Sequence, residues 1–593
     1  MGIMVSNLSS GWQNKARREL MLDTALFVCE DLNLDDLGSV RCRKLHKEDE
    51  YFATLSGTGV VYDYYQLNIE GAGHKLVYYR RDDNLYGWDS YTGETRTLAT
   101  GLSSDRVVSY APLRPVLSTS TYVYITNGLL MLCDTGVSTY SWGIDPPDNL
   151  PLVAMQGSGG NLTAGDYSYR YTFYDSETGA ESDPSVASAT TTAAADDMAV
   201  VSQIQVSPNA RVDRRRVYRT LVGGGVWYLV GSINDNSTTV YIDGTADANL
   251  TAELVTDQGI PPYGDLVISF KDRLFMAGNP DYPNRVYFSE TNKPDMFPST
   301  NYIDVGTAND KVVNMVEFEG KLYFMQTATI TGLYGSDAST YSWHKTRSHV
   351  GVKSPRSVAV GPDGIYFLSH DAVYRFDGLK SVGVSEQIEG VFEDYGDYYT
   401  ELLYVTRMVS YSRGVFLQGR YYLSVPMYMR GYTTSINRLL VYDVFTQTWT
   451  KQMIDCDCLF SDEGDGYLYG GVIAPDATKF SLYKLMCTSS GDGGLYQTPS
   501  PFFITKSYAI APEAKAVGWV RRFRVDCQGD WTLAFYVDGE LVHTETLTSQ
   551  GASSRYQWYS FPGKVKGRYL YVQATATGSP VAQTTMFNEM EIT

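Results

Sequence analysis

The chain has 593 residues, of which 43% are hydrophobic and 19% charged, so it can bury several cores and is long enough for roughly four domains. Acidic residues (67) outnumber basic ones (48), and the formal net charge of −19 argues against a surface that grips nucleic-acid phosphates through lysine and arginine. With 48 tyrosines and 54 glycines, the composition favours β-structure and excludes a coiled coil, a disordered chain and a long helical bundle.

The beginning of the chain predicts a helix. Residues 12–26 carry helix-forming side chains, and Ser9 or Ser10 stands where a helix cap is expected. The first twelve residues have neither the charged nor the apolar region of a secretory signal, so export is not expected. Since no 18 apolar residues run together anywhere, no membrane-spanning helix is expected either.

The seven cysteines are odd in number and scattered, which does not fit a disulfide framework. We expect a reducing cytoplasm and buried thiols that behave as small hydrophobic side chains. The residues expected to be buried are Cys29, Cys42, Cys133, Cys487 and Cys527.

One type of short strand recurs along the chain, an aromatic or branched run that mostly follows a basic residue or a glycine. Its second positions are Leu76, Val123, Leu274, Leu322, Ile365, Tyr421 and Tyr467. Apart from the interval between 123 and 274, successive positions are 43 to 56 residues apart. Such a period predicts an all-β fold, a β-propeller of about seven blades, because each blade needs three or four short strands. A set of separate β-sandwiches is the alternative.

The long interval indicates an inserted domain at residues 157–259. Alternation places Tyr167, Tyr169, Tyr171 and Phe173 on one strand face, and the segment resembles a fibronectin type III module. A further β-sandwich is expected at the end of the chain. The predicted division is a helical or extended docking segment (1–50), the first part of the propeller (51–156), the insert (157–259), the second part of the propeller (260–500) and a C-terminal β-sandwich (501–593).

No sequence motif predicts catalysis, a cofactor or a metal site. The six histidines are scattered, and Cys456 and Cys458 lack the second cysteine pair of a zinc site. There is no G-x-S-x-G, no P-loop, and no G-x-G-x-x-G in a strand–helix context. These motifs therefore assign no enzymatic activity to the chain.

A glycan-binding or glycan-hydrolysing propeller, similar in layout to sialidases, is the alternative function. The Asp boxes of sialidase blades are missing, but a carboxylate pair for glycoside hydrolysis is a three-dimensional feature that sequence does not exclude. Four tryptophans could stack on sugars or belong to the blade and sandwich cores. They are Trp142, Trp343, Trp449 and Trp558.

The one concentrated basic cluster lies in the insert. It comprises Arg211, Arg214, Arg215 and Arg216. It is a candidate contact for a neighbouring subunit or an acidic partner, and a solvated strand edge is the alternative.

Several segments resemble the nozzle, or tail-hub, proteins of short-tailed bacteriophages, the tail tubular protein B-like family. They are the opening at 12–43, with Leu32-Asn33-Leu34, and the stretches 274–278, 286–289, 294–297 and 354–369. The resemblance implies a virion structural protein of the phage tail that is not an enzyme and is made in the bacterial cytoplasm. It also implies a homohexameric ring that binds the head-to-tail adaptor and tail fibre or needle and plug proteins.

In such a ring the protein would retain the genome and let it pass at ejection. An acidic conduit would let DNA slide without adhering, because like charges repel. The candidate lumen-facing carboxylates are Asp394, Asp397, Asp462 and Asp465.

Overall fold

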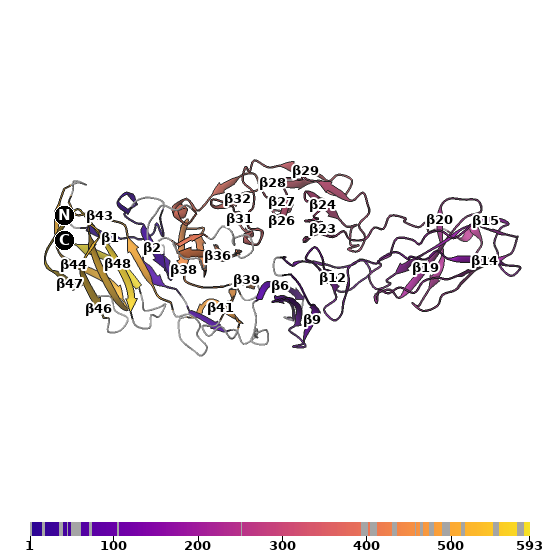
Figure 1. Ribbon diagram of the computed structural model, residues 1–593, viewed down its shortest axis with the longest axis horizontal. Coiled ribbons are helices and arrows are strands. Elements are labelled where there is room, and N and C mark those ends of the chain that lie inside the picture. The colour runs from indigo at the N-terminus through magenta and orange to yellow at the C-terminus, as the bar shows by residue number, and fades with distance from the viewer. Residues whose placement is uncertain are drawn as a thin grey trace.

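The computed structural model is an elongated molecule with both chain ends at one tip and the inserted domain at the other (Figure 1). A ring of sheets occupies the middle of the molecule. The residues that the structure describes are 3–14, 18–34, 39–43, 45–48, 61–69, 74–103, 106–250, 252–392, 401–403, 412–429, 436–456, 458–462, 466–473, 480–488, 499–511, 516–548, 557–577 and 586–593.

The ring begins with four antiparallel blades, two before the insert and two after it. The first has β6 (Val61–Ile69), β7 (His74–Arg81), β8 (Asn84–Asp89) and β9 (Thr95–Ala99). The second has β10 (Ser109–Leu113), β11 (Tyr122–Thr126), β12 (Met131–Asp134) and β13 (Thr139–Ser141). The third has β22 (Leu266–Phe270), β23 (Arg273–Ala277), β24 (Arg285–Phe288) and β25 (Tyr302–Asp304). The fourth has β26 (Val312–Phe318), β27 (Lys321–Gln326), β28 (Ile330–Tyr334) and β29 (Ser342–Lys345).

Three further blades complete the ring. The fifth has β30 (Ala359–Gly361), β31 (Gly364–Leu368), β32 (Val373–Phe376) and β33 (Ser381–Gly383), with the short helices η4 (Pro355–Ser357) before it and η5 (Glu386–Val391) after it. The sixth has β35 (Arg413–Leu417), β36 (Arg420–Met429), β37 (Ile436–Asp443) and β38 (Thr448–Gln452), and β34 (Glu401–Leu403) also pairs with β36. The seventh has β39 (Cys458–Asp462), β40 (Tyr467–Ile473), β41 (Phe480–Thr488) and β5 (Leu45–Glu48).

The first strand of each blade lies innermost. Strands β10 and β22, β22 and β26, β30 and β35, β35 and β39, and β39 and β6 contact one another around the axis. Stacking of Tyr65 on Tyr110, with ring centroids 5.2 Å apart, joins the first blade to the second. A hydrogen bond of 2.7 Å from Asn314 Nδ2 to the Pro355 carbonyl joins the fourth to the fifth. The ring is closed by β5, which comes from the beginning of the chain and pairs with β41.

The predicted fold class, an all-β propeller with an insert and a C-terminal sandwich, is confirmed. All seven positions that defined the repeat fall in the second strand of a blade, β7, β11, β23, β27, β31, β36 or β40. This agreement has a physical reason. The second strand is covered on both faces by neighbouring blades, and so it keeps the most uniform apolar sequence.

The insert is a separate β-sandwich with a tyrosine-rich core. Its sheets are β14 (Leu152–Gln156), β18 (Met198–Ser202) and β21 (Tyr241–Asp243); β15 (Gly165–Tyr167) and β17 (Thr191–Ala193); and β16 (Tyr169–Tyr174), β19 (Arg214–Thr220) and β20 (Trp227–Ile233), with η3 (Asp247–Asn249) nearby. Tyr167, Tyr169, Tyr171 and Phe173 are all buried in one cluster, as the alternation predicts.

The N-terminal segment is woven into the rest of the chain. Strand β1 (Ile3–Ser6) pairs with β49, and β2 (Leu26–Glu30) lies between β38 of the sixth blade and β42 of the sandwich. The helix predicted over 12–26 is wrong for the described residues, where only the short η1 (Arg18–Leu20) is helical and residues 15–17 lie outside the description. The apolar run from Leu26 to Cys29 is buried as strand, because tertiary pairing outweighs the helix propensity of its neighbours.

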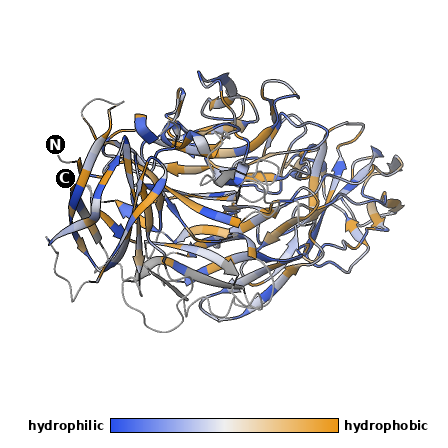
Figure 2. Ribbon diagram, turned by 60° about the vertical axis from the view of Figure 1, so that its left-hand side comes forward, coloured by the Kyte–Doolittle hydropathy of each residue, from blue (hydrophilic) through white to orange (hydrophobic). Residues whose placement is uncertain are grey.

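The C-terminal sandwich packs two sheets over an aromatic core that contains Phe503, Phe523 and Trp531. Burying one such side chain stabilises the fold by about 1.5–3 kcal/mol. Figure 2 shows hydrophobic bands on the strands of this sandwich and of the ring, alternating with hydrophilic ones. The remaining strands are β3 (Leu32–Leu34), β4 (Val40–Cys42), β42 (Phe502–Thr505), β43 (Tyr508–Ala509), β44 (Gly518–Gln528), β45 (Asp530–Val537), β46 (Glu540–Leu547), β47 (Gln557–Gly567), β48 (Tyr569–Thr577) and β49 (Met586–Ile592).

Candidate functional site

The arginine cluster predicted from sequence does not form one surface patch. The Arg211 side chain is buried, 3% exposed, and its Nη1 and Nη2 donate hydrogen bonds of 2.8 Å to the two carboxylate oxygens of Asp295 in the ring. Its Nε donates to Asp175 Oδ2 at 3.2 Å. This arginine therefore fixes the insert to the third blade instead of facing a partner.

The other three arginines have separate environments. Arg215 is buried and donates to Asn236 Oδ1 at 3.2 Å and to the Thr238 carbonyl. Arg216 donates to Glu181 at 2.8 Å and covers the ring of Tyr174. Arg214, 44% exposed, is the member that remains on the surface, and its partner contact stays a prediction.

The predicted acidic lumen has one described member. Asp394, Asp397 and Asp465 lie outside the described residues. The Asp462 side chain is 1% exposed, and its carboxylate forms an ion pair with Lys75 of the first blade. It therefore joins the seventh blade to the first and does not face an open channel.

The aromatic candidates for sugar stacking are mostly core residues. Trp142 and Trp449 are buried, and their indole N–H groups donate to the carbonyls of Pro294 at 2.9 Å and Val384 at 2.7 Å. Trp343 packs partly buried against the core shared by the third and fourth blades. Trp558 is exposed, but Arg522 lies over its ring at 4.2 Å.

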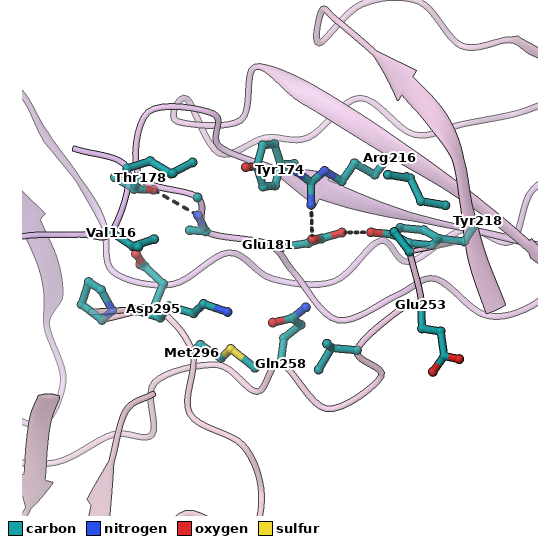
Figure 3. Close-up of a pocket in the computed structure, with 18 residues that line it drawn as sticks. Val116, Tyr174, Thr178, Glu181, Arg216, Tyr218, Glu253, Gln258, Asp295 and Met296 are labelled. Carbon is teal, nitrogen blue, oxygen red and sulfur yellow. Dashed lines mark hydrogen bonds and ion pairs between the residues drawn. The ribbon is translucent and has the colours of Figure 1, made fainter. Parts of the chain in front are cut away.

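A pocket of about 310 Å³ lies where the insert meets the second and third blades (Figure 3). Figure 3 shows the Glu181 carboxylate held between Arg216 and Tyr218, and Thr172 is a third donor, at 2.6 Å. Both carboxylate oxygens of Asp295 accept hydrogen bonds from Arg211, and Asp295 also accepts one from the Gly143 backbone N–H at 3.0 Å. Hydrogen bonds within the chain therefore occupy the carboxylates of both Glu181 and Asp295. Since the bonds of Asp295 connect the ring to the insert, we interpret this pocket as part of the joint between the two domains.

A larger cavity, of about 500 Å³, opens at the end of the ring where the innermost strands begin. Residues just before or at the start of β10, β22, β26 and β30 line it, so four blades contribute. Backbone and side-chain bonds fix the wall, since Ser109 Oγ donates to the Val267 carbonyl at 3.1 Å and accepts from its N–H at 3.0 Å. The apolar part of the wall consists of Val107, Val108, Leu266, Pro280, Pro283, Val312, Val313 and Pro355.

Four charged side chains line this axial cavity: Arg106, Asp265, Lys311 and Arg356. Arg106 Nη1 is 3.1 Å from Asp265 Oδ1. Arg356 Nη2 is 2.9 Å from Oδ1 of Asp63, a buried carboxylate on β6. Lys311 is exposed just before β26. The charged groups of the axial cavity remain partly open to a ligand, since the Arg106 and Asp265 side chains are 37% and 48% exposed.

Two of these groups have shifted pKa values. Burial raises the pKa of the Asp265 carboxyl above its ordinary range, and the positive charge of Arg106 partly opposes the shift. Burial also lowers the pKa of Arg356, and the charge of Arg80 adds to that effect while Asp63 opposes it. Asp265 therefore holds a proton at higher pH than an ordinary aspartate, which suits a proton donor.

The sequence contains no local signal for this site. Its charged residues stand singly before four different strands, and Arg106 and Asp265 are 159 positions apart. The repeat itself is the one signal that could have found them, because residues preceding the first strand of successive blades meet at one end of a propeller axis.

Within the described residues, no group of three or more histidine, cysteine or acidic side chains is arranged to hold a metal ion. No helix in this part of the chain is long and apolar enough to cross a membrane. The expected burial of Cys29, Cys42, Cys133 and Cys527 is confirmed, and the side chain of Cys487 lies outside the description.

No family model matches the chain, and neither does any curated protein. Among solved structures, it is similar to an exo-β-1,3-galactanase from Phanerochaete chrysosporium with β-1,3-galactotriose, at 9% identity over 93% of this chain and 99% of that one, with a TM-score of 0.20. A glycoside hydrolase family 43 arabinoxylan arabinofuranohydrolase from Bacillus subtilis aligns at 11% identity over 67% and 93%, with a TM-score of 0.17. The extracellular domain of a one-component system from B. thetaiotaomicron aligns at 11% identity over 86% and 87%, also with a TM-score of 0.17.

These findings correct the phage-tail interpretation. The solved structures described above include glycoside hydrolases, and no family model or curated protein supports a tail nozzle. The predictions of a virion conduit, of a non-enzymatic protein and of hexamer, adaptor, fibre, plug and DNA partners are therefore wrong. TM-scores of 0.20 and below are too low for any residue, reaction or substrate to be carried over.

Proposed function

We propose that the protein is a glycan-active β-propeller that binds a saccharide in the axial cavity. The observation that carries the proposal is the cavity of about 500 Å³ whose wall combines apolar surface with Arg106, Asp265, Lys311 and Arg356. Ligand sites in proteins have this size and this mixture of apolar wall and a few convergent polar groups. Saccharides present both C–H faces and hydroxyl groups, which suit the two kinds of wall.

Hydrolysis is supported by Asp265. Its raised pKa and its position at the cavity wall suit a general acid for a glycosidic oxygen. In this step Asp265 donates its proton to the glycosidic oxygen as the bond from that oxygen to the anomeric carbon breaks. Water adds to the anomeric carbon, and the proton it loses restores the acid form of Asp265.

The remaining charged groups hold the wall in shape. Arg106 is paired with Asp265 at 3.1 Å, and Asp63 orients Arg356 from behind at 2.9 Å. The Asp63 side chain is 7% exposed, so it acts on a ligand only through Arg356.

The experiment is a screen of the full-length protein against defined oligosaccharides, measuring binding by calorimetry and cleavage by release of reducing ends. The Asp265→Asn variant should retain binding and lose cleavage. Asp304→Asn is the matched control, because Asp304 is equally exposed at 48% and is also paired with an arginine, but on the outer strand of the third blade. Absence of saccharide binding across the panel would overturn the proposal, and equal cleavage by both variants would overturn the role of Asp265.

A further inference from the structure

The axial cavity is positively charged although the chain is strongly acidic. Among the described residues that line it, three side chains are cationic and one is a carboxylate. The whole chain carries a formal net charge of −19, so this local excess runs against the composition. A cavity lined by one sign of charge attracts ligands of the opposite sign.

Arg80, which lies behind the wall of the axial cavity, adds to the positive charge there. Arg80 is fully buried and donates only to backbone carbonyls in its described hydrogen bonds, those of Asp82 at 2.9 Å, Arg106 at 2.7 Å and Leu102 at 3.4 Å. None of these three described acceptors is a carboxylate, and the nearest carboxylate on the neighbouring strand, that of Asp63, is the ion-pair partner of Arg356. Arg80 is near enough to Arg356 to disfavour the charged form of that residue.

Arg356 is incompletely satisfied. Its Nη2 meets Asp63 at 2.9 Å, but its buried Nε has no hydrogen-bond partner in the structure. A buried cation with a free donor is costly unless an anion completes its bonding. Lys311, exposed on the same cavity wall, offers a second positive charge.

We propose that the axial cavity selects saccharides that carry an acidic group, which Arg356 and Lys311 bind while Asp265 stays near the glycosidic bond. This inference rests on the proposed glycan activity and specifies its substrate class. The shared chemistry is an anionic substituent, a uronate carboxylate or a sulfate ester. A guanidinium binds either through charge-assisted hydrogen bonds.

The test compares galactotriose, tri-galacturonate and a sulfated galactotriose as ligands of the full-length protein, by calorimetry at low and at physiological salt. An acidic trisaccharide should bind at least about tenfold more tightly than the neutral one, the equivalent of about one charge-assisted hydrogen bond. The preference should shrink as salt rises, since screening weakens partly exposed charge pairs. The acidic trisaccharide with the higher affinity shows whether the site prefers a carboxylate or a sulfate group.

The Lys311→Ala variant should lose most of that preference, because removing the ammonium group should weaken binding of the acidic trisaccharide far more than binding of galactotriose. Lys321→Ala is the matched control, because Lys321 is another exposed lysine of the fourth blade and does not line the cavity. Equal binding of neutral and acidic sugars would overturn the inference and leave the proposed function standing, whereas binding of none would overturn both. A single-stranded oligonucleotide that binds as tightly as the acidic sugar, and is lost in Lys311→Ala, would overturn saccharide selection in favour of a general polyanion site.

Discussion

Arg106 and Asp265 are 159 residues apart in sequence, yet their side chains form an ion pair of 3.1 Å at the mouth of the axial cavity. The inserted domain occupies most of the chain between them. The pair therefore joins the second blade to the third, which are separated in sequence by the insert. Asp265 is the one carboxyl among the described residues of the cavity wall, and Arg106 holds it in position.

Cleavage should depend on pH through Asp265. Because burial raises the pKa of this carboxyl, its proton-donating form persists above the pH at which an ordinary aspartate ionises. Cleavage of a saccharide should therefore stay high at acidic pH and fall only as pH rises through the raised pKa. A pH–rate profile measures this, and a rate that increases with pH across the same range would contradict the assignment.

Gly128 should be required for the geometry of the ion pair. It has a φ of +81°, and a Cβ there would overlap Asp265 Oδ1 and lie 2.7 Å from Arg106 Nη1. Gly128→Ala should weaken saccharide binding or cleavage by about tenfold or more, because misplacing a catalytic group by 1 Å can cost about a hundredfold. Gly93→Ala is the control: its φ is +72°, and nothing lies within 4 Å of an added Cβ. Equal loss in both variants would indicate backbone strain alone.

The joint between the insert and the ring should depend on Arg211. This side chain and Asp295 are 3% and 6% exposed, so removing either one leaves a buried charge without its partner. Arg211→Met should destabilise the protein by about 3–5 kcal/mol, whereas Arg211→Met with Asp295→Leu should recover only part of that loss, because the buried Asp175 also loses its bond to Arg211. Arg214→Met, at an exposed site, should change stability by less than about 0.5 kcal/mol.

Urea unfolding followed by tryptophan fluorescence measures these changes, since the Trp142 indole donates to the carbonyl of Pro294, next to Asp295. Equal urea midpoints for Arg211→Met and Arg214→Met would contradict the role of Arg211 in joining the insert to the ring.

The cysteines should resist thiol reagents in the native protein. Burial raises the pKa of Cys42 to about 12 and that of Cys29 further, so almost no reactive thiolate exists at pH 8. Cys29, Cys42, Cys133 and Cys527 should react with iodoacetamide only after denaturation, as mass spectrometry of the labelled peptides would show. Rapid native labelling of Cys42 would contradict its burial on β4.

The sequence predicted the ring because the second strands of the blades carry similar apolar runs at a regular spacing, Leu322 and Ile365 among them. It did not predict that β5 closes the ring, because a strand that pairs with a partner more than 400 residues away leaves no periodic signal. The helix expected over 12–26 failed because local propensity is weaker than the pairing of β2 between two sheets.

The residues of the candidate site could not be predicted from the sequence for a different reason. Arg211 and Arg216 form a conspicuous cluster in sequence, but folding places them in separate ion pairs with Asp295 and Glu181. Arg106, Asp265 and Arg356 are inconspicuous one by one, and only the closure of the ring brings them together. The wrong expectation of a non-enzymatic conduit came from a resemblance spread over short segments, none of which carries chemistry.

The most direct test is the structure of the full-length protein determined with an acidic trisaccharide at saturating concentration. The expected result is density for the sugar in the axial cavity, with its acidic group on Arg356 and Lys311 and a glycosidic oxygen within hydrogen-bond distance of Asp265. An empty axial cavity, or a sugar bound elsewhere on the molecule, would contradict it.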